Sequence, residues 1–181
     1  MRAAIALVGE RGTAAVPVSE IADAADVSRQ LVYQHFGDRD TLLLEAAIDL
    51  ARRELLPGFA DARSTPGGRA PALAMARHFA GHRAFYRALL TGSSAFALNR
   101  ELTNLLIPVN RQVVQHHYGR LLDPRSVDDL ATFLTGGGAA FVNTWVVEGA
   151  EPLDPEEFTD RLLRMVSVVF AQHPSDLEEP R

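Results

Sequence analysis

An all-α fold is predicted for this chain of 181 residues, and three observations lead to it. Alanine and leucine, which are strong helix formers, dominate the sequence. No stretch alternates between apolar and polar residues with the turn spacing of a sheet. Breaks rich in glycine and proline, the clearest at residues 64–68, separate the helical stretches. The sequence therefore predicts a helical unit before this break and a larger helical unit after it.

The helices are bounded by residues that start or stop helices. Gly12 ends the first helix, Ser28 and Asp38 have the chemistry of N-caps, and Pro57 with Gly58 ends the fourth helix. Pro108 is expected to kink the long seventh helix. We expect helices over residues 2–11, 18–25, 28–35, 39–55, 71–80, 82–91, 95–118, 126–148 and 155–172, with a connection over 119–125 and a frayed tail over 174–181.

Composition excludes several classes of protein. The chain is 47% hydrophobic and 23% charged, as is ordinary for a soluble globular protein. It has no cysteine, which excludes disulfides, thiolate nucleophiles and cysteine-based zinc sites. No apolar run approaches the roughly 20 residues that span a bilayer, and residues 3–8 are too short for a signal peptide. We therefore expect a cytoplasmic protein with no membrane partner.

Summed over the whole chain, the net charge of −5 argues against a nucleic-acid partner, because contacts to phosphate need cations. The local placement of cations matters more than the sum. All 18 cations are arginine, whose planar guanidinium binds phosphate and guanine in bidentate fashion. An arginine bias of this kind is also typical of a GC-rich genome.

Residues 18–39 carry the most informative pattern. Ile21, Ala22 and Ala25 form the inward face of a short helix, and the two alanines let a second helix cross closely. Asp26 stands at the turn, where a left-handed backbone is expected and where aspartate is tolerated. Val27 is expected to plug this turn into the core. A helix, a tight turn and a capped second helix are the parts of a helix-turn-helix.

The second helix of this window presents a polar outer face. Val32 and Phe36 lie four residues apart and bury its other side. The outward residues are Arg29, Gln30, Tyr33 and Gln34. Arginine pairs with guanine and glutamine with adenine in the major groove, and the free N–H groups near Ser28 favour a phosphate. The alternative is a small three-helix packing unit without a nucleic-acid partner.

This window resembles the DNA-binding signature of the tetracycline-repressor (TetR) family. The matching residues are Ile21-Ala22, Ala25-Asp26-Val27-Ser28, Leu31-Val32-Tyr33, His35-Phe36 and Asp38-Arg39-Asp40-Thr41-Leu42. The resemblance implies that Tyr33, His35 and Arg39 contact phosphate, and that Arg29, Gln30 and Gln34 sit where bases are read. For His35 a helix-end role, capping a neighbouring carbonyl, stays open. The chain departs from the family at Pro17, which occupies the position of a capping hydroxyl residue, while Ser19 falls inside the helix.

The resemblance implies a two-part organisation. Residues 1–45 are expected to form the DNA-binding domain, with the helix over 39–55 as a link, and residues 46–173 a ligand-binding and dimerisation domain. The implied function is a regulator, a repressor in the usual family behaviour, that binds double-stranded operator DNA as a homodimer. A small hydrophobic or amphipathic effector would release it, and no enzyme activity or cofactor is expected.

The last two helices carry broad apolar stripes, which call for two partners: the chain's own core and a second copy. Two recognition helices about 34–36 Å apart would read a palindrome. The alternative is that both stripes are core of one chain. The expected interface residues are Phe133, Leu134, Phe158, Leu162, Met165 and Val169. Three successive glycines at 136–138 cost about 1 kcal/mol each in a helix, which indicates a close helix approach or, alternatively, a widened space or a bend.

The effector pocket is expected where polar groups fall on otherwise apolar faces. The candidates are His78, His82, Tyr86, Phe96, Asn99, Thr103, Asn110, Phe141 and Trp145, with Phe133 and Asn143 as further wall residues. Each of them has an alternative as a satisfied polar group or a surface side chain.

His78 and His82 share a helix face, as paired metal ligands do. No carboxylate lies at a sequence spacing that would indicate a third metal ligand, so no metal is expected. A small helical enzyme or metal-binding protein using these histidines is the alternative function. A third hypothesis is a helical module that binds DNA without sequence preference.

Overall fold

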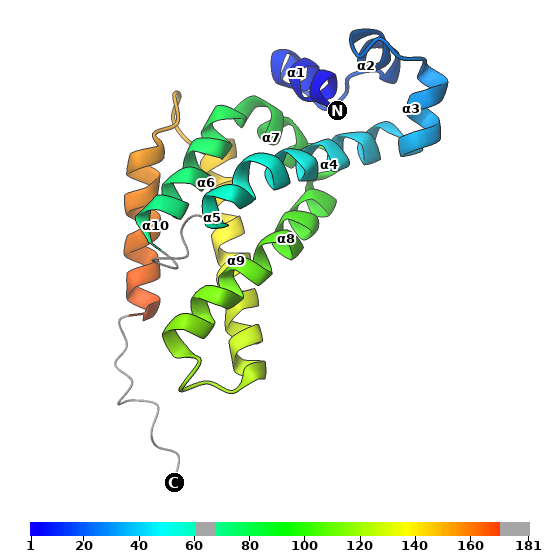
Figure 1. The fold of residues 1–181 in the computed structure, drawn as a ribbon. Helices are drawn as coiled ribbons and strands as arrows, with labels where there is room; N and C mark the ends of the chain where they lie inside the picture. The colour runs from blue at the N-terminus through cyan, green and yellow to red at the C-terminus, as the bar shows by residue number, and fades with distance from the viewer. Residues whose placement is uncertain (61–67, 171–181) are drawn as a thin grey trace.

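The computed structural model describes residues 1–60 and 68–170, and within these ranges every regular element is helical (Figure 1). The elements are α1 (Arg2–Arg11), α2 (Val18–Ala24), α3 (Arg29–Phe36), α4 (Arg39–Leu50), η1 (Ala51–Leu55), α5 (Leu56–Ala60), α6 (Arg69–Gly81), α7 (Arg83–Leu90), α8 (Ala95–Tyr118), α9 (Pro124–Glu148) and α10 (Pro155–Phe170). The all-α prediction is confirmed. The expected tail over 174–181 lies outside the described residues.

The first three helices form a small unit at one end of the molecule (Figure 1). Its core is apolar: Ala4, Val8, Ile21 and Ala22 are all buried. Gly12 ends α1 in the left-handed conformation, with φ of 64°, as a helix-terminating glycine does. Besides packing on α2 and α4, α1 packs on α7, so this unit rests directly on the rest of the chain.

The fourth helix does not end at Pro57 as predicted. Helical backbone continues from α4 through the π-helical segment η1 and through α5 as far as Ala60. A proline ring clashes with the carbonyl four residues before it in a regular α-helix, and a π-helical turn is one way to re-space those groups. The result is one long helical rod from Arg39 into the body of the molecule, as Figure 1 shows in cyan.

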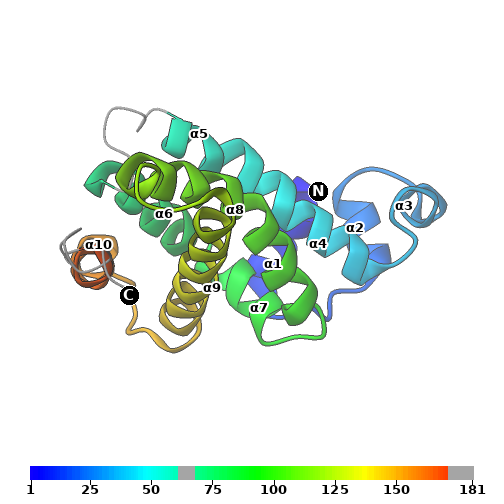
Figure 2. The ribbon, with the colours of Figure 1, turned by 90° about the horizontal axis from the view of Figure 1, so that it is seen from below.

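The two longest helices, α8 and α9, pack against each other and extend away from the N-terminal unit (Figures 1 and 2). Helix α9 begins two residues earlier than predicted, with Pro124 as its first residue. The Asp123 carboxylate accepts hydrogen bonds from the backbone N–H groups of Arg125 and Ser126 at 2.9 and 3.1 Å. Proline is favoured at this first position because its missing N–H has no partner there in any case.

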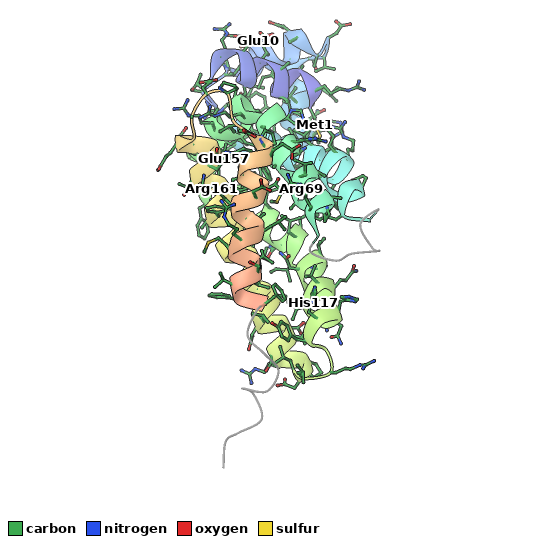
Figure 3. The ribbon with its side chains drawn as sticks, turned by 90° about the vertical axis from the view of Figure 1, so that its left-hand side faces the viewer. Met1, Glu10, Arg69, His117, Glu157 and Arg161 are labelled. Carbon is green, nitrogen blue, oxygen red and sulfur yellow. The ribbon has the colours of Figure 1, made fainter. Side chains whose placement is uncertain are left out.

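Helix α10 packs on α6 and lies beside the α8–α9 pair (Figures 1 and 2). Ion pairs join the two helices on their exposed side: Arg69 binds Glu156 at 2.7 Å and also Asp160, and Arg77 binds Glu156 at 3.0 Å. The view in Figure 3 shows α10 along this face, with Arg69 next to it. The space enclosed between α6, α8, α9 and α10 is the setting of the cavity described below.

Helix α9 is the one described helix that is long and apolar enough to cross a bilayer by length and composition, with a mean hydropathy of 1.3 over an 18-residue window. The expectation that no apolar segment approaches this length was wrong, because alanine, leucine, valine and phenylalanine outweigh the threonines and glycines of this helix, which has no charged residue between Leu130 and Val147. Only 28% of that window is buried inside the chain. Packing against α8 covers part of the helix, and a wide apolar face is left over.

The three glycines of α9 do not mark a close approach of two helices within the chain. A Cβ placed on Gly136, Gly137 or Gly138 would meet nothing within 4 Å among the described residues. A close helix approach at these glycines is therefore not made among the described residues of this chain. Gly136 and Gly137 lie on the exposed face, and Gly138 borders the cavity.

Candidate functional site

The turn between α2 and α3 has the backbone geometry of a helix-turn-helix. Asp26 adopts a positive φ of 53°, as predicted, and the N–H of Val27 donates to the Ala22 carbonyl at 3.0 Å. The Ser28 hydroxyl oxygen then accepts a hydrogen bond from the Leu31 N–H at 3.1 Å and caps α3. These local bonds fix the angle at which α3 leaves the turn.

Two expectations about this turn were wrong. Val27 is 37% exposed rather than inserted in the core, and Ala25 is exposed as well. The reason is that Ile21 and Val32, both buried, already fill the space under the turn. The backbone hydrogen bond of Val27, rather than its side chain, holds the turn in place.

The outer face of α3 is open to solvent. Arg29, Gln30, Tyr33 and Gln34 are all exposed, Tyr33 by 48%, while Val32 on the opposite side is buried. His35 is exposed in the last turn of the helix. In Figure 1, α3 lies at the outer end of the molecule, away from the α8–α9 pair. A protruding helix with this polar face can enter the major groove of a duplex.

A surface depression of about 420 Å³ adjoins the exposed face of α3. It is lined by Val16, Pro17, Val18, Ser19, Arg29, Tyr33, Asp38 and Arg39. Residues from α2, α3 and the start of α4 therefore converge there. Pro17 precedes α2 and supplies no side-chain cap, in line with the departure seen in the sequence. Arg39 is not free: its Nε and Nη2 donate to Asp40 at 3.2 and 3.0 Å.

A cavity of about 660 Å³ lies between α6, α8, α9 and α10. Most of its wall is apolar, with Met75, Phe79, Leu102 and Leu106 among the lining residues. Of the predicted pocket residues, Asn99, Thr103 and Asn110 line it, and so does the further candidate Asn143. The size and the mostly apolar wall with a few polar groups are typical of small-molecule sites.

Four polar side chains of the cavity wall form two hydrogen-bonded pairs. The Asn143 amide donates to Asn99 Oδ1 at 2.5 Å, and the Asn110 amide donates to the Thr135 hydroxyl at 2.8 Å. Each pair joins α8 to α9 in the wall of the cavity. A ligand with polar atoms would exchange these hydrogen bonds for its own, whereas an apolar ligand would leave them intact.

The other predicted pocket residues lie elsewhere. Phe96 is 79% exposed on α8, because it falls on the side of that helix that no described element covers. Phe141 and Trp145 stack on Phe158, with ring centroids 5.0 and 4.1 Å apart, in the core between α9 and α10. These three expectations for the pocket were wrong, since helical spacing does not tell a cavity wall from a core contact.

His78 and Tyr86 belong to a buried polar pair instead of the cavity. His78 Nε2 and the Tyr86 hydroxyl lie 2.9 Å apart. Burial lowers the pKa of His78 to about 4 and raises the pKa of Tyr86, so both side chains are neutral near pH 7. His82 Nε2 lies 2.7 Å from Glu54 Oε2 of η1. These three residues therefore also fall outside the cavity lining.

The predicted interface residues divide into three groups. Phe133 and Met165 are 70% and 58% exposed, as an interface residue of a single protomer would be. Leu134 and Leu162 are half-buried and line the cavity. Phe158 is fully buried, so its assignment to an interface was wrong: the stripe it belongs to faces Trp145 of its own chain. The Val169 side chain lies outside the described residues.

The cavity walls contain residues that sequence reasoning missed. Met75, Val142, Leu163 and Val166 line the cavity, but each also fits the apolar stripe of a core helix. The sequence holds no signal that separates the two roles. Which stripe faces empty space depends on how far apart α6, α8, α9 and α10 stand.

The exposed capped helix and the larger helical unit behind it define a helix-turn-helix DNA-binding protein with a second, cavity-bearing domain. Residues 1–46 match the family model "Bacterial regulatory proteins, tetR family". The match covers the N-terminal helix-turn-helix, which is therefore similar to the DNA-binding domain of TetR-family regulators.

Solved structures of TetR type share the fold over nearly the whole chain. RolR (NCGL1110), solved without ligand, is 22% identical, with a TM-score of 0.66 and coverage of 99% of this chain and 95% of its own. The TetR family repressor AlkX from Dietzia sp. strain DQ12-45-1b, implicated in n-alkane biodegradation, is also 22% identical, with a TM-score of 0.59 and coverage of 93% and 94%. No curated protein matches the chain closely enough to be a recognised relative.

Proposed function

We propose that this chain is a homodimeric repressor that binds palindromic operator DNA through α3 and leaves it when a small apolar or amphipathic molecule enters the cavity. The observation that carries the proposal is the exposure of Arg29, Gln30, Tyr33 and Gln34 on one face of a helix whose opposite face is buried. A surface of that composition has no role in the chain's own core.

In this proposal the residues of α3 divide by chemistry. Arg29, Gln30 and Gln34 read bases, because guanidinium and amide groups match the edges of guanine and adenine. Tyr33, His35 and Arg39 contact phosphates and fix the register of the helix on the duplex. The N-terminal end of α3 at Ser28 adds free backbone N–H groups beside them.

The dimer is proposed to form through the uncovered faces of α9 and α10. Phe133 on α9 and Met165 on α10 are large, apolar and exposed, and Val168 is 68% exposed beside them on α10. Gly136 and Gly137 leave space on α9 for a second helix to approach. A second copy would bury the apolar face of α9 that the chain itself leaves open, and it would supply the second recognition helix that a palindrome needs.

The effector is proposed to act by shifting a two-state equilibrium. The rod of α4, η1 and α5 runs from Arg39 beside the DNA-binding face to Phe59, which lines the cavity. A ligand that favours a wider separation of α6, α8, α9 and α10 would tilt this rod and change the spacing of the two α3 helices. Such a protein would work in the cytoplasm, where its DNA is.

Selection from a random duplex library by the full-length protein tests the proposal directly. We expect enrichment of an inverted repeat with half-sites about one helical turn apart, and loss of enrichment with Arg29→Ala. Arg87→Ala is the matched control, because Arg87 is an exposed arginine on α7, away from α3. Binding that shows no sequence preference and vanishes with moderate salt would contradict the proposal.

A further inference from the structure

Three potential metal ligands from separate elements meet on the side of the rod that faces α6. Glu54 comes from η1, His78 from α6 and His82 from the junction of α6 and α7. One ligand atom of each lies within 4.8 Å of the ligand atoms of the other two. The Glu54 Oε2 atom is 2.7 Å from His82 Nε2 and 3.5 Å from His78 Nδ1.

Only one of the two ring nitrogens of His78 has a hydrogen-bond partner. The His78 side chain is only 3% exposed, and its other ring nitrogen, Nε2, is taken by the Tyr86 hydroxyl at 2.9 Å. Nδ1 is buried and has no hydrogen-bond partner. Leaving a buried polar atom without a partner costs free energy, so such an atom in a folded protein calls for an explanation.

We propose that Glu54, His78 and His82 form a binding site for a divalent transition-metal ion of the zinc type. The ligands are Glu54 Oε2, His78 Nδ1 and His82 Nε2, with water in a fourth position. Two imidazoles and one carboxylate suit zinc, whereas calcium and magnesium prefer sets made of oxygen alone. The ion would give the buried Nδ1 atom its partner.

The geometry needs only small adjustments. A tetrahedral ion with ligands at about 2.0–2.1 Å places its ligand atoms about 3.3 Å apart. The distance of 3.5 Å between His78 Nδ1 and Glu54 Oε2 already fits, and the 2.7 Å between His82 Nε2 and Glu54 Oε2 must open by about 0.6 Å. The ligand atoms of His78 and His82 lie within 4.8 Å of each other. The side chains that move are accessible: His82 is 29% exposed and Glu54 is 44% exposed. Their exposure also gives the ion an entry path.

Tyr86 already orients His78, the most buried of the three proposed ligands. Tyr86 holds His78 Nε2, which is the arrangement that outer-shell groups provide in metal sites, since they fix the ring and point its free nitrogen at the ion. An ion here would join η1 to α6 and to the start of α7, and so would fix the rod against the cavity-bearing domain.

Titration of the metal-free full-length protein with ZnCl₂ by calorimetry tests the site. We expect one ion per chain, and a melting temperature higher by about 5–10 °C at a hundredfold excess over the Kd. Cobalt(II) in place of zinc should give visible bands of four- or five-coordinate geometry. Magnesium should give no comparable binding.

Two variants locate the ion without touching the buried histidine. Glu54→Gln and His82→Ala change accessible side chains, and each should weaken zinc binding at least about tenfold while circular dichroism stays unchanged. The control replaces both His116 and His117 by alanine and should bind zinc as the parent does. The proposed site is refuted if the parent protein takes up no stoichiometric zinc. It is also refuted if both site variants still take up zinc as the parent does. The outcome does not depend on whether the protein binds DNA.

Discussion

The carboxylate of Asp40 in the first turn of α4 accepts a hydrogen bond from the Ser93 hydroxyl at 2.6 Å, and its other oxygen binds Arg39. Ser93 lies in the turn between α7 and α8, and α8 carries the cavity residues Asn99 and Thr103. One carboxylate therefore connects a candidate phosphate-binding arginine to the turn that leads into α8, one of the helices that line the cavity.

Removing the Ser93 hydroxyl is expected to destabilise the fold by about 0.5–1 kcal/mol, a value reduced for the partial exposure of the pair. The hydrogen bond from Ser93 is the largest of the effects that hold the pKa of Asp40 below its ordinary 3.8, followed on the lowering side by Arg39. A depressed pKa contributes stability that is present above the unfolded-state value and is lost as pH falls through the folded-state value. The stability difference between Ser93→Ala and the parent should therefore shrink below about pH 4.

Urea denaturation between pH 3 and pH 7 measures this difference. Ser167→Ala is a matched control, because the Ser167 hydroxyl donates only to a carbonyl of its own helix. Equal losses for the two serine variants, with no change on acidification, would show that the Asp40 contact contributes nothing.

Replacing Arg29 and replacing Arg39 by alanine should weaken DNA binding in different ways. Arg29→Ala is expected to relax base preference at one position and to cost about 1–3 kcal/mol on the preferred sequence. Arg39→Ala should weaken binding to all duplexes alike and should reduce the salt slope by about one ion. Fluorescence anisotropy against the selected duplex and single-base variants, at several salt concentrations, separates the two effects. The assignment of roles is wrong if Arg39→Ala changes base preference.

Phe133→Arg is expected to give a monomer. The side chain is 70% exposed on the apolar face of α9, and a buried unpaired guanidinium in an interface would oppose association. Phe96→Arg is the control, since Phe96 is 79% exposed on α8, outside the proposed interface. Light scattering coupled to size exclusion reports the mass directly. Dimers of both variants, or a parent protein that is monomeric at micromolar concentration, contradict the proposed interface.

Gly138→Leu should raise stability and close part of the cavity. Replacing a glycine inside a helix by leucine favours the helix by up to about 1 kcal/mol, and a Cβ at this position meets nothing within 4 Å. The larger side chain would occupy space that a ligand needs. We expect a higher melting temperature together with weaker binding of an amphipathic fluorescent probe such as anilinonaphthalene sulfonate.

The matched control for that variant is Gly9→Leu. Gly9 is also a helical glycine with open space around it, but it lies in α1, outside the cavity lining. It should keep the probe affinity of the parent protein. A loss of probe binding in both variants would show that the probe does not report on the cavity.

Local signals predicted the elements well. Caps at Ser28 and Asp38 and the glycine after α1 set helix ends that agree with the structure to within a residue or two, because these bonds involve neighbours in the chain. The rod through Pro57 was missed, since a π-helical turn accommodates a proline that would break a regular helix. The polar face of α3 was readable for the same local reason: helical spacing alone decides which side chains share a face.

The sequence by itself determined that this chain is helical, where most helices begin and end, and which residues face outward from α3. Only the tertiary structure decided that Asn99 and Thr103 border a cavity while Phe96 does not, and that Glu54 stands beside His78 and His82. Helix periodicity and caps arise from bonds between residues a few positions apart. A cavity wall or a three-residue cluster depends on the distances between whole helices, which the packing of many side chains fixes together.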